Sequence, residues 1–139
     1  MRKSLTILMM AVMIMTAAIV PAQAAVIPGE EIAPMAMYHH EANATLTISS
    51  SGMAEAKGQI TGWIGTTTKC SITLYLQRYE NGDWEDVAMW TDTANGSSLT
   101  LTRTLGVDSG YKYRAKAICY AYSGSQMEYV TRYSSEVYY

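Results

Sequence analysis

From Ala44 onward, hydrophobic and polar residues alternate in short stretches that are separated by Gly, Asn and Ser. Alternation with a period of two is typical of strands that bury one face, and no stretch after residue 25 keeps a helical period. Seven short strands in about 95 residues predict an all-β fold, a single antiparallel immunoglobulin or fibronectin type III-like sandwich. We expect the strands at residues 44–50, 53–64, 69–79, 83–91, 98–104, 110–122 and 126–138.

Local signals refine this prediction. Asn81-Gly82 is a strong signal for a two-residue hairpin turn, because both residues tolerate positive φ. Trp84 and Val87 are three residues apart and would point to opposite faces of a regular strand, so a bulge lies between them if both are buried. Residues 91–97 are expected to form a loop. Small residues at alternate positions of 53–64 indicate close approach of the other sheet: Ala54, Ala56, Gly58, Ile60, Gly62 and Ile64.

The first 24 residues have the features of a secretory signal peptide. A basic start is followed by an uncharged run over 5–20, then by Pro21 and the small-residue pattern Ala22-Gln23-Ala24. A membrane-spanning helix is the alternative, but it needs about 20 apolar residues. We therefore expect a cleaved signal peptide over 1–24, a flexible lead-in over 25–43 and one sandwich domain over 44–139 in a secreted protein.

Composition and charge narrow the function. Loss of Arg2 and Lys3 with the leader leaves eight basic residues against all twelve acidic ones, so the mature net charge is −4. A nucleic-acid-binding domain would need a basic surface. His39 and His40, the only histidines, fall in the lead-in, where adjacent side chains suit neither a catalytic triad nor a metal site. We expect no enzyme activity, no cofactor and no metal.

Two structural features follow from the predicted sandwich. Leu105 precedes Tyr111 by six residues, a spacing that resembles the tyrosine corner of fibronectin type III domains, in which the hydroxyl bonds back to the upstream backbone; an ordinary strand with a buried Tyr is the alternative. Cys70 and Cys119 are the only cysteines, and in an exported protein such a pair is most simply a disulfide. Pairing them sets a register between strands 69–79 and 110–122 in which Leu74 faces Ala115. Two unpaired thiols are the alternative.

That register also defines a candidate binding surface. It places Tyr75 beside Arg114 on the outer face of the sheet, with Lys112 and Lys116 on the same strand as Arg114. Tyrosine supplies rigid amphipathic contact area, and arginine stacks on aromatic rings. A solvated sheet face built from residues of good β propensity is the alternative. The candidate residues are Tyr75, Tyr79, Arg114, Tyr120 and Tyr122.

The mature chain resembles a family of small secreted proteins of Gram-positive bacteria with no assigned function. The resembling segments are LQRYENGDWEDVAMW at 76–90 and the stretch from GYKYRAKAICYAYSG to the end at 110–139. These motifs describe strands and turns, so the resemblance implies a fibronectin type III or immunoglobulin-like domain and no catalytic residue.

We therefore expect a secreted, non-enzymatic binding module that contacts a cell-surface or extracellular protein through the tyrosine face. Carbohydrate binding is the first alternative, because aromatic faces stack on sugar rings. A self-associating structural subunit is the second, because an open edge at the end of strand 126–138 would allow strand addition. No nucleic-acid partner and no membrane span in the mature chain are expected.

Overall fold

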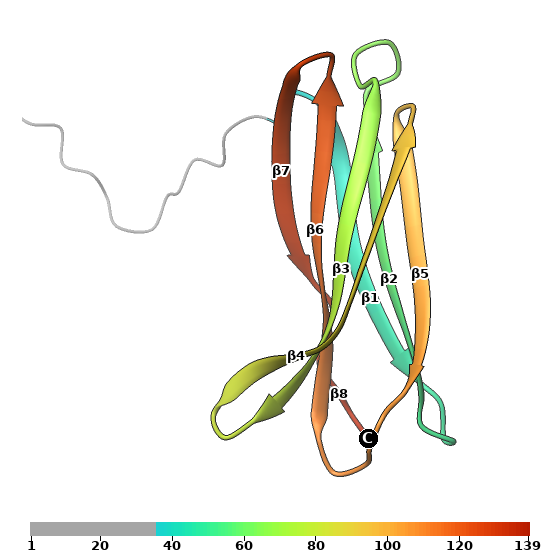
Figure 1. Ribbon diagram of the computed structural model, residues 1–139, viewed down its shortest axis with the longest axis vertical. Helices are drawn as coiled ribbons and strands as arrows, with labels where there is room; N and C mark the ends of the chain where they lie inside the picture. Colours follow the sequence, from blue (N-terminus) through green and yellow to red (C-terminus); the bar gives the residue numbers. More distant parts are fainter. Residues whose placement is uncertain (1–35) are drawn as a thin grey trace, which may run out of the picture. The chain divides into compact units, whose positions relative to one another are not determined.

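The computed structural model describes residues 36–139, which form two antiparallel β-sheets packed face to face (Figure 1). The compact unit that contains them runs from Pro34 to Tyr139. The predicted signal peptide over 1–24 and the lead-in up to residue 35 lie outside the described residues. Within residues 36–139, no helix has the length and hydrophobicity to cross a membrane.

The smaller sheet has three strands in the order β1-β2-β5. These are β1 (His39–Ile48), β2 (Met53–Gly62) and β5 (Ser98–Gly106). The larger sheet has the order β4-β3-β6-β7, and a short β8 also pairs with β6. Its strands are β3 (Lys69–Glu80), β4 (Asp83–Asn95), β6 (Lys112–Ser123), β7 (Gln126–Tyr133) and β8 (Val137–Tyr138).

Three predicted strands differ most from the observed ones. β1 starts at His39, five residues earlier than expected, and β4 continues to Asn95, so most of the predicted loop over 91–97 is strand. The last predicted strand is divided into β7 and β8, which gives eight strands instead of seven. The break falls at Ser134, whose backbone N–H and side-chain Oγ both bond to the backbone of Ala115 at 2.9 and 2.8 Å.

The predicted hairpin is confirmed, and a bulge is present, although Trp84 faces outward and is not buried together with Val87 as the prediction required. Asn81 and Gly82 have φ values of 54° and 85°, as a two-residue turn between right-twisted strands requires. Leu76 pairs with Ala88 and Gln77 pairs with Asp86, so Val87 is the extra residue of a bulge. Figure 1 shows the β3–β4 hairpin curving away from β5 beyond this point.

The hydrophobic core lies between the sheets and combines large residues of β3 with small residues of β2 and β6. Ile72, Leu74 and Leu76 are fully buried. A Cβ added to Gly58 would lie 3.0 Å from Ile72 Cγ2, so the missing side chain allows the sheets to approach closely. The predicted small-residue face of β2 is confirmed from Ala54 to Gly62, but Ile64 lies beyond the strand and is 93% exposed.

The register between β3 and β6 differs by two residues from the predicted one. Cys70 lies opposite Ala121 and Cys119 opposite Ile72, so the cysteines are diagonal neighbours and not direct partners. Both are free and buried, and the predicted disulfide is absent. The two Sγ atoms are directed apart: that of Cys70 lies 3.7 Å from Gly96 O, and that of Cys119 lies 3.7 Å from Gln59 O. Burial raises the pKa of both thiols, that of Cys119 to about 11.

The hydroxyl that bonds to the upstream backbone belongs to Tyr113 and not to Tyr111. Tyr113 Oη donates to Asp108 O at 2.7 Å, and its ring is 1% exposed. Tyr111 is half-buried and packs its ring against the Arg78 guanidinium, 4.4 Å from the ring centroid. Leu105 is 36% exposed on an edge strand and does not anchor a corner. The predicted corner therefore exists two residues further along the chain.

Candidate binding face

Aromatic and basic side chains gather on the outer face of the larger sheet. They occupy the positions that alternate with the buried residues of β3 and β6, and β4 and β7 extend the same face. We call this surface the aromatic–cation face. It comprises Lys69, Tyr75, Tyr79, Trp84, Lys112, Arg114, Lys116, Tyr120, Tyr122, Tyr129 and Tyr133.

All five residues of the predicted tyrosine face lie on this surface, because a register shift of two residues leaves the facing of each strand unchanged. The predicted neighbours do differ. Tyr75 lies opposite Lys116 and Arg114 lies opposite Gln77, so Tyr75 and Arg114 are diagonal and not adjacent. Tyr122 lies opposite Lys69.

Each basic side chain on this face packs over at least one aromatic ring. Lys69 Nζ lies 4.1 Å from the Tyr122 centroid, and Lys112 Nζ lies 4.9 Å from that of Tyr79. Lys116 Nζ lies 5.2 Å from the centroid of Tyr75. Such contacts are attractive because the negative face of the ring meets the cation.

Arg114 occupies the best-defined position on the aromatic–cation face. Its guanidinium carbon lies 4.2 Å from the Trp84 centroid and 4.3 Å from the Tyr133 centroid. Its Nε donates to Gln77 Oε1 at 2.8 Å, and Gln77 Nε2 donates to Asp86 Oδ1 at 2.7 Å. Because Gln77 is only 5% exposed, this chain of hydrogen bonds orients the guanidinium from below.

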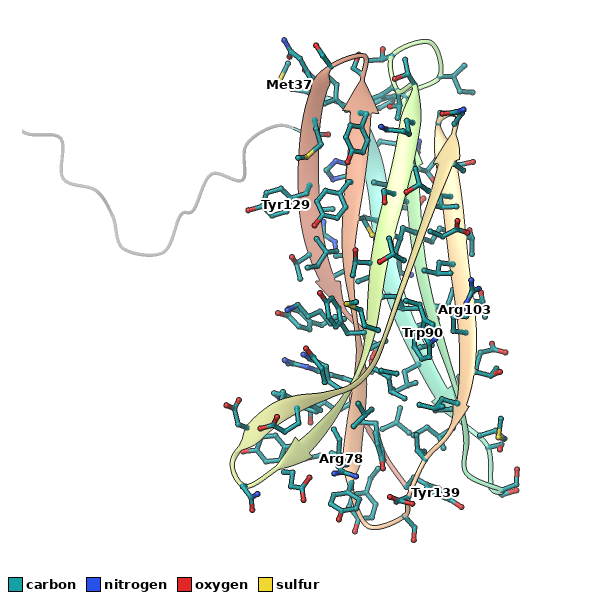
Figure 2. All side chains as sticks on the ribbon, in the orientation of Figure 1. Met37, Arg78, Trp90, Arg103, Tyr129 and Tyr139 are labelled. Atoms are coloured by element: carbon teal, nitrogen blue, oxygen red, sulfur yellow. The ribbon has the colours of Figure 1, made fainter. Side chains whose placement is uncertain are left out.

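Sequence reasoning missed three aromatic members of the face: Trp84, Tyr129 and Tyr133. Tyr129 is 66% exposed on β7 and lies 5.9 Å from Tyr120, measured between ring centroids; Figure 2 labels its position. The alternation of Met127, Tyr129, Thr131 and Tyr133 was available as a signal. The predicted strand over 126–138 runs through the break at Ser134, so the prediction does not state on which side of the sheet these residues lie.

The outer face of the smaller sheet has a different character. Its paired outward positions hold Thr, Ser, Asn, Gln, Glu and Lys, apart from Met53 and Gly106 at one end, and neither Tyr nor Trp occurs along β1, β2 or β5. A solvated sheet face needs no aromatic residues, as this second face demonstrates. The concentration of rings on one face is therefore not a general consequence of β propensity.

The charge of the aromatic–cation face is largely unneutralised. No ion pair within residues 36–139 involves Lys69, Arg114 or Lys116. Lys112 is the exception, because its Nζ lies 3.3 Å from Glu136 Oε2. Hydrogen bonds connect Arg114 to one acidic side chain, that of Asp86, and this connection runs through Gln77. The face is thus locally basic in a chain with more acidic than basic residues.

A second polar cluster ties the start of β1 to β7. The Glu128 carboxylate accepts hydrogen bonds from the backbone N–H groups of Met37, Tyr38 and His39 at 2.6–3.0 Å, and His39 Nδ1 lies 2.7 Å from Oε1. Burial raises the pKa of this carboxyl, but the three N–H donors and His39 together lower it below its ordinary value. The cluster closes one side of the sandwich and exposes no ligand position.

A pocket of about 210 Å³ lies beside the base of the β3–β4 hairpin and is lined by Arg78, Val87, Val107 and Tyr113 among others. The Arg78 guanidinium is already engaged, because its Nη2 donates to Glu80 Oε2 at 2.6 Å and its plane packs on Tyr111. Asp108 lies 3.8 Å from Nη1. In residues 36–139 no three His, Cys, Asp or Glu side chains gather as metal ligands would.

The fold and the face together define a small β-sandwich that presents one aromatic, basic sheet surface. No family model matches the chain, and no curated protein matches it. The family resemblance inferred from the sequence therefore remains a prediction.

Two solved structures have a similar fold. The solution structure of CsgH from R. palustris is 14% identical with a TM-score of 0.41, covering 68% of this chain and 92% of that one. The crystal structure of a protein from Archaeoglobus fulgidus is 12% identical with a TM-score of 0.41, covering 73% of this chain and 97% of that one. Likeness at this level is to a small β-sandwich and carries no information on function.

Proposed function

We propose that this chain is an exported, non-enzymatic binding module of immunoglobulin or fibronectin type III-like topology. Its partner is an extracellular or cell-surface protein that it holds on the aromatic–cation face. The sheet orders β1-β2-β5 and β4-β3-β6-β7 support this topology. The observation that carries the binding role is the contrast between the two outer faces, since only one concentrates tyrosine, tryptophan and unpaired cations.

The physical basis is the kind of contact that these residues make. Tyrosine and tryptophan bury a large area at low conformational cost, and they are enriched where proteins bind one another. Several rings of the face are only partly buried: Tyr79 is 37% exposed, Tyr129 66% and Tyr133 51%. They retain apolar area that a partner would cover. The rigid sheet beneath them reduces the entropy lost on binding.

The test is capture of a partner from the envelope fraction of the producing cell by the immobilised mature chain. We expect Tyr75→Ser with Tyr120→Ser to abolish the capture of any protein that the unaltered chain retains. Trp63→Ser is the matched control, because Trp63 is a half-exposed aromatic residue in the loop after β2, off the face. Equal capture by all three proteins would refute the proposal.

Carbohydrate binding is the second candidate, and the Tyr120–Tyr129 pair favours it. No basic side chain in residues 36–139 packs over either of these rings, in contrast to the rings of Tyr75, Tyr79 and Tyr122. Their faces are therefore free to stack on a sugar. A glycan array that includes peptidoglycan fragments tests this candidate, and an absence of hits would exclude it.

Self-association by strand addition is the third candidate. β7 and β8 each pair with β6 alone within residues 36–139, so the expected edge at the C-terminal end is open on its outer side. The free edge of β5 carries Arg103, which is exposed and lies opposite Ala56 in the register (Figure 2). A charged side chain on an edge strand is a known protection of sheet edges. Sedimentation at high protein concentration tests this alternative, and a monomer would remove it.

A further inference from the structure

The aromatic–cation face also indicates the chemistry of its partner. We propose that Arg114 and Lys116 form a receptor for two carboxylates of an extended acidic peptide segment with acidic residues at alternate positions. This inference rests on the proposed binding function and deepens it. It concerns which part of a partner protein lies on the face.

The first step is the state of the Arg114 guanidinium. Its carbon lies 4.2 Å from the Trp84 centroid and 4.3 Å from the Tyr133 centroid, so rings from strands on opposite sides of β6 contact it, and its Nε donates to Gln77. The two Nη atoms make no hydrogen bond to any atom of residues 36–139, yet they are not among the buried unsatisfied atoms. The edge that carries these two nitrogens therefore faces solvent, with its donors unused.

The second step is the chemistry of that edge. A guanidinium presents parallel N–H donors that match the two oxygens of one carboxylate, and a bidentate pair is stronger than a neutral hydrogen bond. The stacking and the Gln77 bond already fix the orientation of Arg114. Less side-chain entropy is then lost when an anion arrives, which makes the site preorganised.

The third step is the spacing of the second cation. Lys116 follows Arg114 by two residues on β6 and points to the same face, so their Cα atoms are separated by roughly 6.6–6.8 Å. Alternate side chains of an extended peptide have the same separation. Lys116 has no ion-pair partner within residues 36–139, so its charge is available as well. The spacing favours a peptide with acidic residues at alternate positions.

The fourth step is charge complementarity. Arg114 and Lys116 are flanked by Tyr75 and Tyr133, which offer apolar contact to the residues between two carboxylates. Lys112 further along β6 is paired with Glu136, and the unpaired Lys69 lies at the other end of the face, opposite Tyr122, so Arg114 and Lys116 are the two neighbouring cations available. Asp86 approaches from β4, but its Oδ1 is engaged by Gln77.

The experiment measures binding of three labelled, end-blocked nonapeptides to the mature chain at low salt. One has Glu at alternate positions with Ser between, the second has Gln in place of Glu, and the third has the same glutamates in one block. We expect the alternating Glu peptide to bind most tightly. Arg114→Lys, which keeps the charge but loses the fork, and Lys116→Gln should each weaken that binding about tenfold.

The matched control is Lys57→Gln, which removes the same charge from the outer face of the smaller sheet and should leave binding unchanged. Thermal unfolding of each variant establishes that it folds. Lys116→Gln is the safer variant, since Lys116 makes no side-chain hydrogen bond within the described chain and its loss leaves no buried group unpaired. Equal binding of the Gln peptide or of the block peptide would overturn the inference. Unchanged binding by Arg114→Lys and Lys116→Gln would do the same, as would binding of a polyuronate chain but of no peptide.

Failure of this inference can be separated from failure of the proposed function. If the tyrosine substitutions abolish envelope capture while Arg114→Lys and Lys116→Gln do not, the acidic-peptide receptor is refuted and the binding module stands. If the tyrosine substitutions leave capture unchanged, the binding module itself is refuted.

Discussion

The hydrogen bond from Tyr113 to the Asp108 carbonyl gives a sharp stability prediction. In Tyr113→Phe, the ring stays in a site that is 1% exposed, but the hydroxyl that donates to Asp108 O at 2.7 Å is removed. A typical net hydrogen bond contributes about 1 kcal/mol, and leaving one buried partner unsatisfied adds to the loss. We expect the free energy of unfolding to fall by about 1–2 kcal/mol.

The matched control is Tyr111→Phe, two residues earlier on the same chain. Tyr111 is half-buried, and its hydroxyl makes no hydrogen bond to any atom in residues 36–139. Its contact with Arg78 is made by the ring, which phenylalanine retains. We expect a change within about 0.5 kcal/mol.

The assay is thermal and urea unfolding of the three proteins, followed by circular dichroism. For a domain of this size, the expected loss in Tyr113→Phe lowers the Tm by about 5–10 °C, and Tyr111→Phe shifts it little. Measurements belong below pH 9, where the phenol is neutral in both states, because its ordinary pKa is 10.0 and burial raises the pKa of Tyr113 further in the folded protein. A larger loss in Tyr111→Phe than in Tyr113→Phe would refute the assignment of the corner.

Four further outcomes follow from the structure. The pKa of Glu128 is lowered on folding, so its carboxylate stabilises the fold at pH values above its ordinary pKa of 4.5, and this stabilisation is lost as the pH falls further. Glu128→Gln should therefore lower the free energy of unfolding at pH 7, and the difference from the unaltered protein should disappear in acid. Cys70 and Cys119 should resist a thiol reagent at pH 8 in the native protein and react fully in denaturant, and a native mass lower by two hydrogens would contradict this expectation. The raised pKa of Cys119 adds a loss of stability as the pH rises from 9 through about 11, which Cys119→Ala should remove. Arg103→Val should cause concentration-dependent association in sedimentation, and a strictly monomeric variant would show that this charge does not protect the β5 edge.

The strands and turns could be predicted because their causes are local. Period-two alternation locates the strands, and Asn81-Gly82 predicts the hairpin through backbone conformation. Each of these signals depends on residues that are neighbours along the chain. The same alternation placed the five tyrosine-face residues on the correct side of the sheet.

The errors arose where distant contacts decide. The β3–β6 register was inferred by assuming a bond between Cys70 and Cys119, and alternation accepts a shift of two residues without penalty. Similarly, β1 begins early because Glu128, far along the chain, receives its first backbone N–H groups. The position of Arg114 between Trp84 and Tyr133 needs the four strands β4, β3, β6 and β7 in correct register, so no local pattern could reveal it.

Because Trp84 lies on the aromatic–cation face, its fluorescence can report binding at that face. Trp84 contacts Arg114 on one side and lies 5.2 Å from Tyr79 between ring centroids, whereas Trp63 and Trp90 lie elsewhere in the fold. An anion that draws the guanidinium away from the indole, or covers it, alters the surroundings of this one chromophore. Indole emission from a chain that retains only this tryptophan would therefore register occupancy without any attached dye.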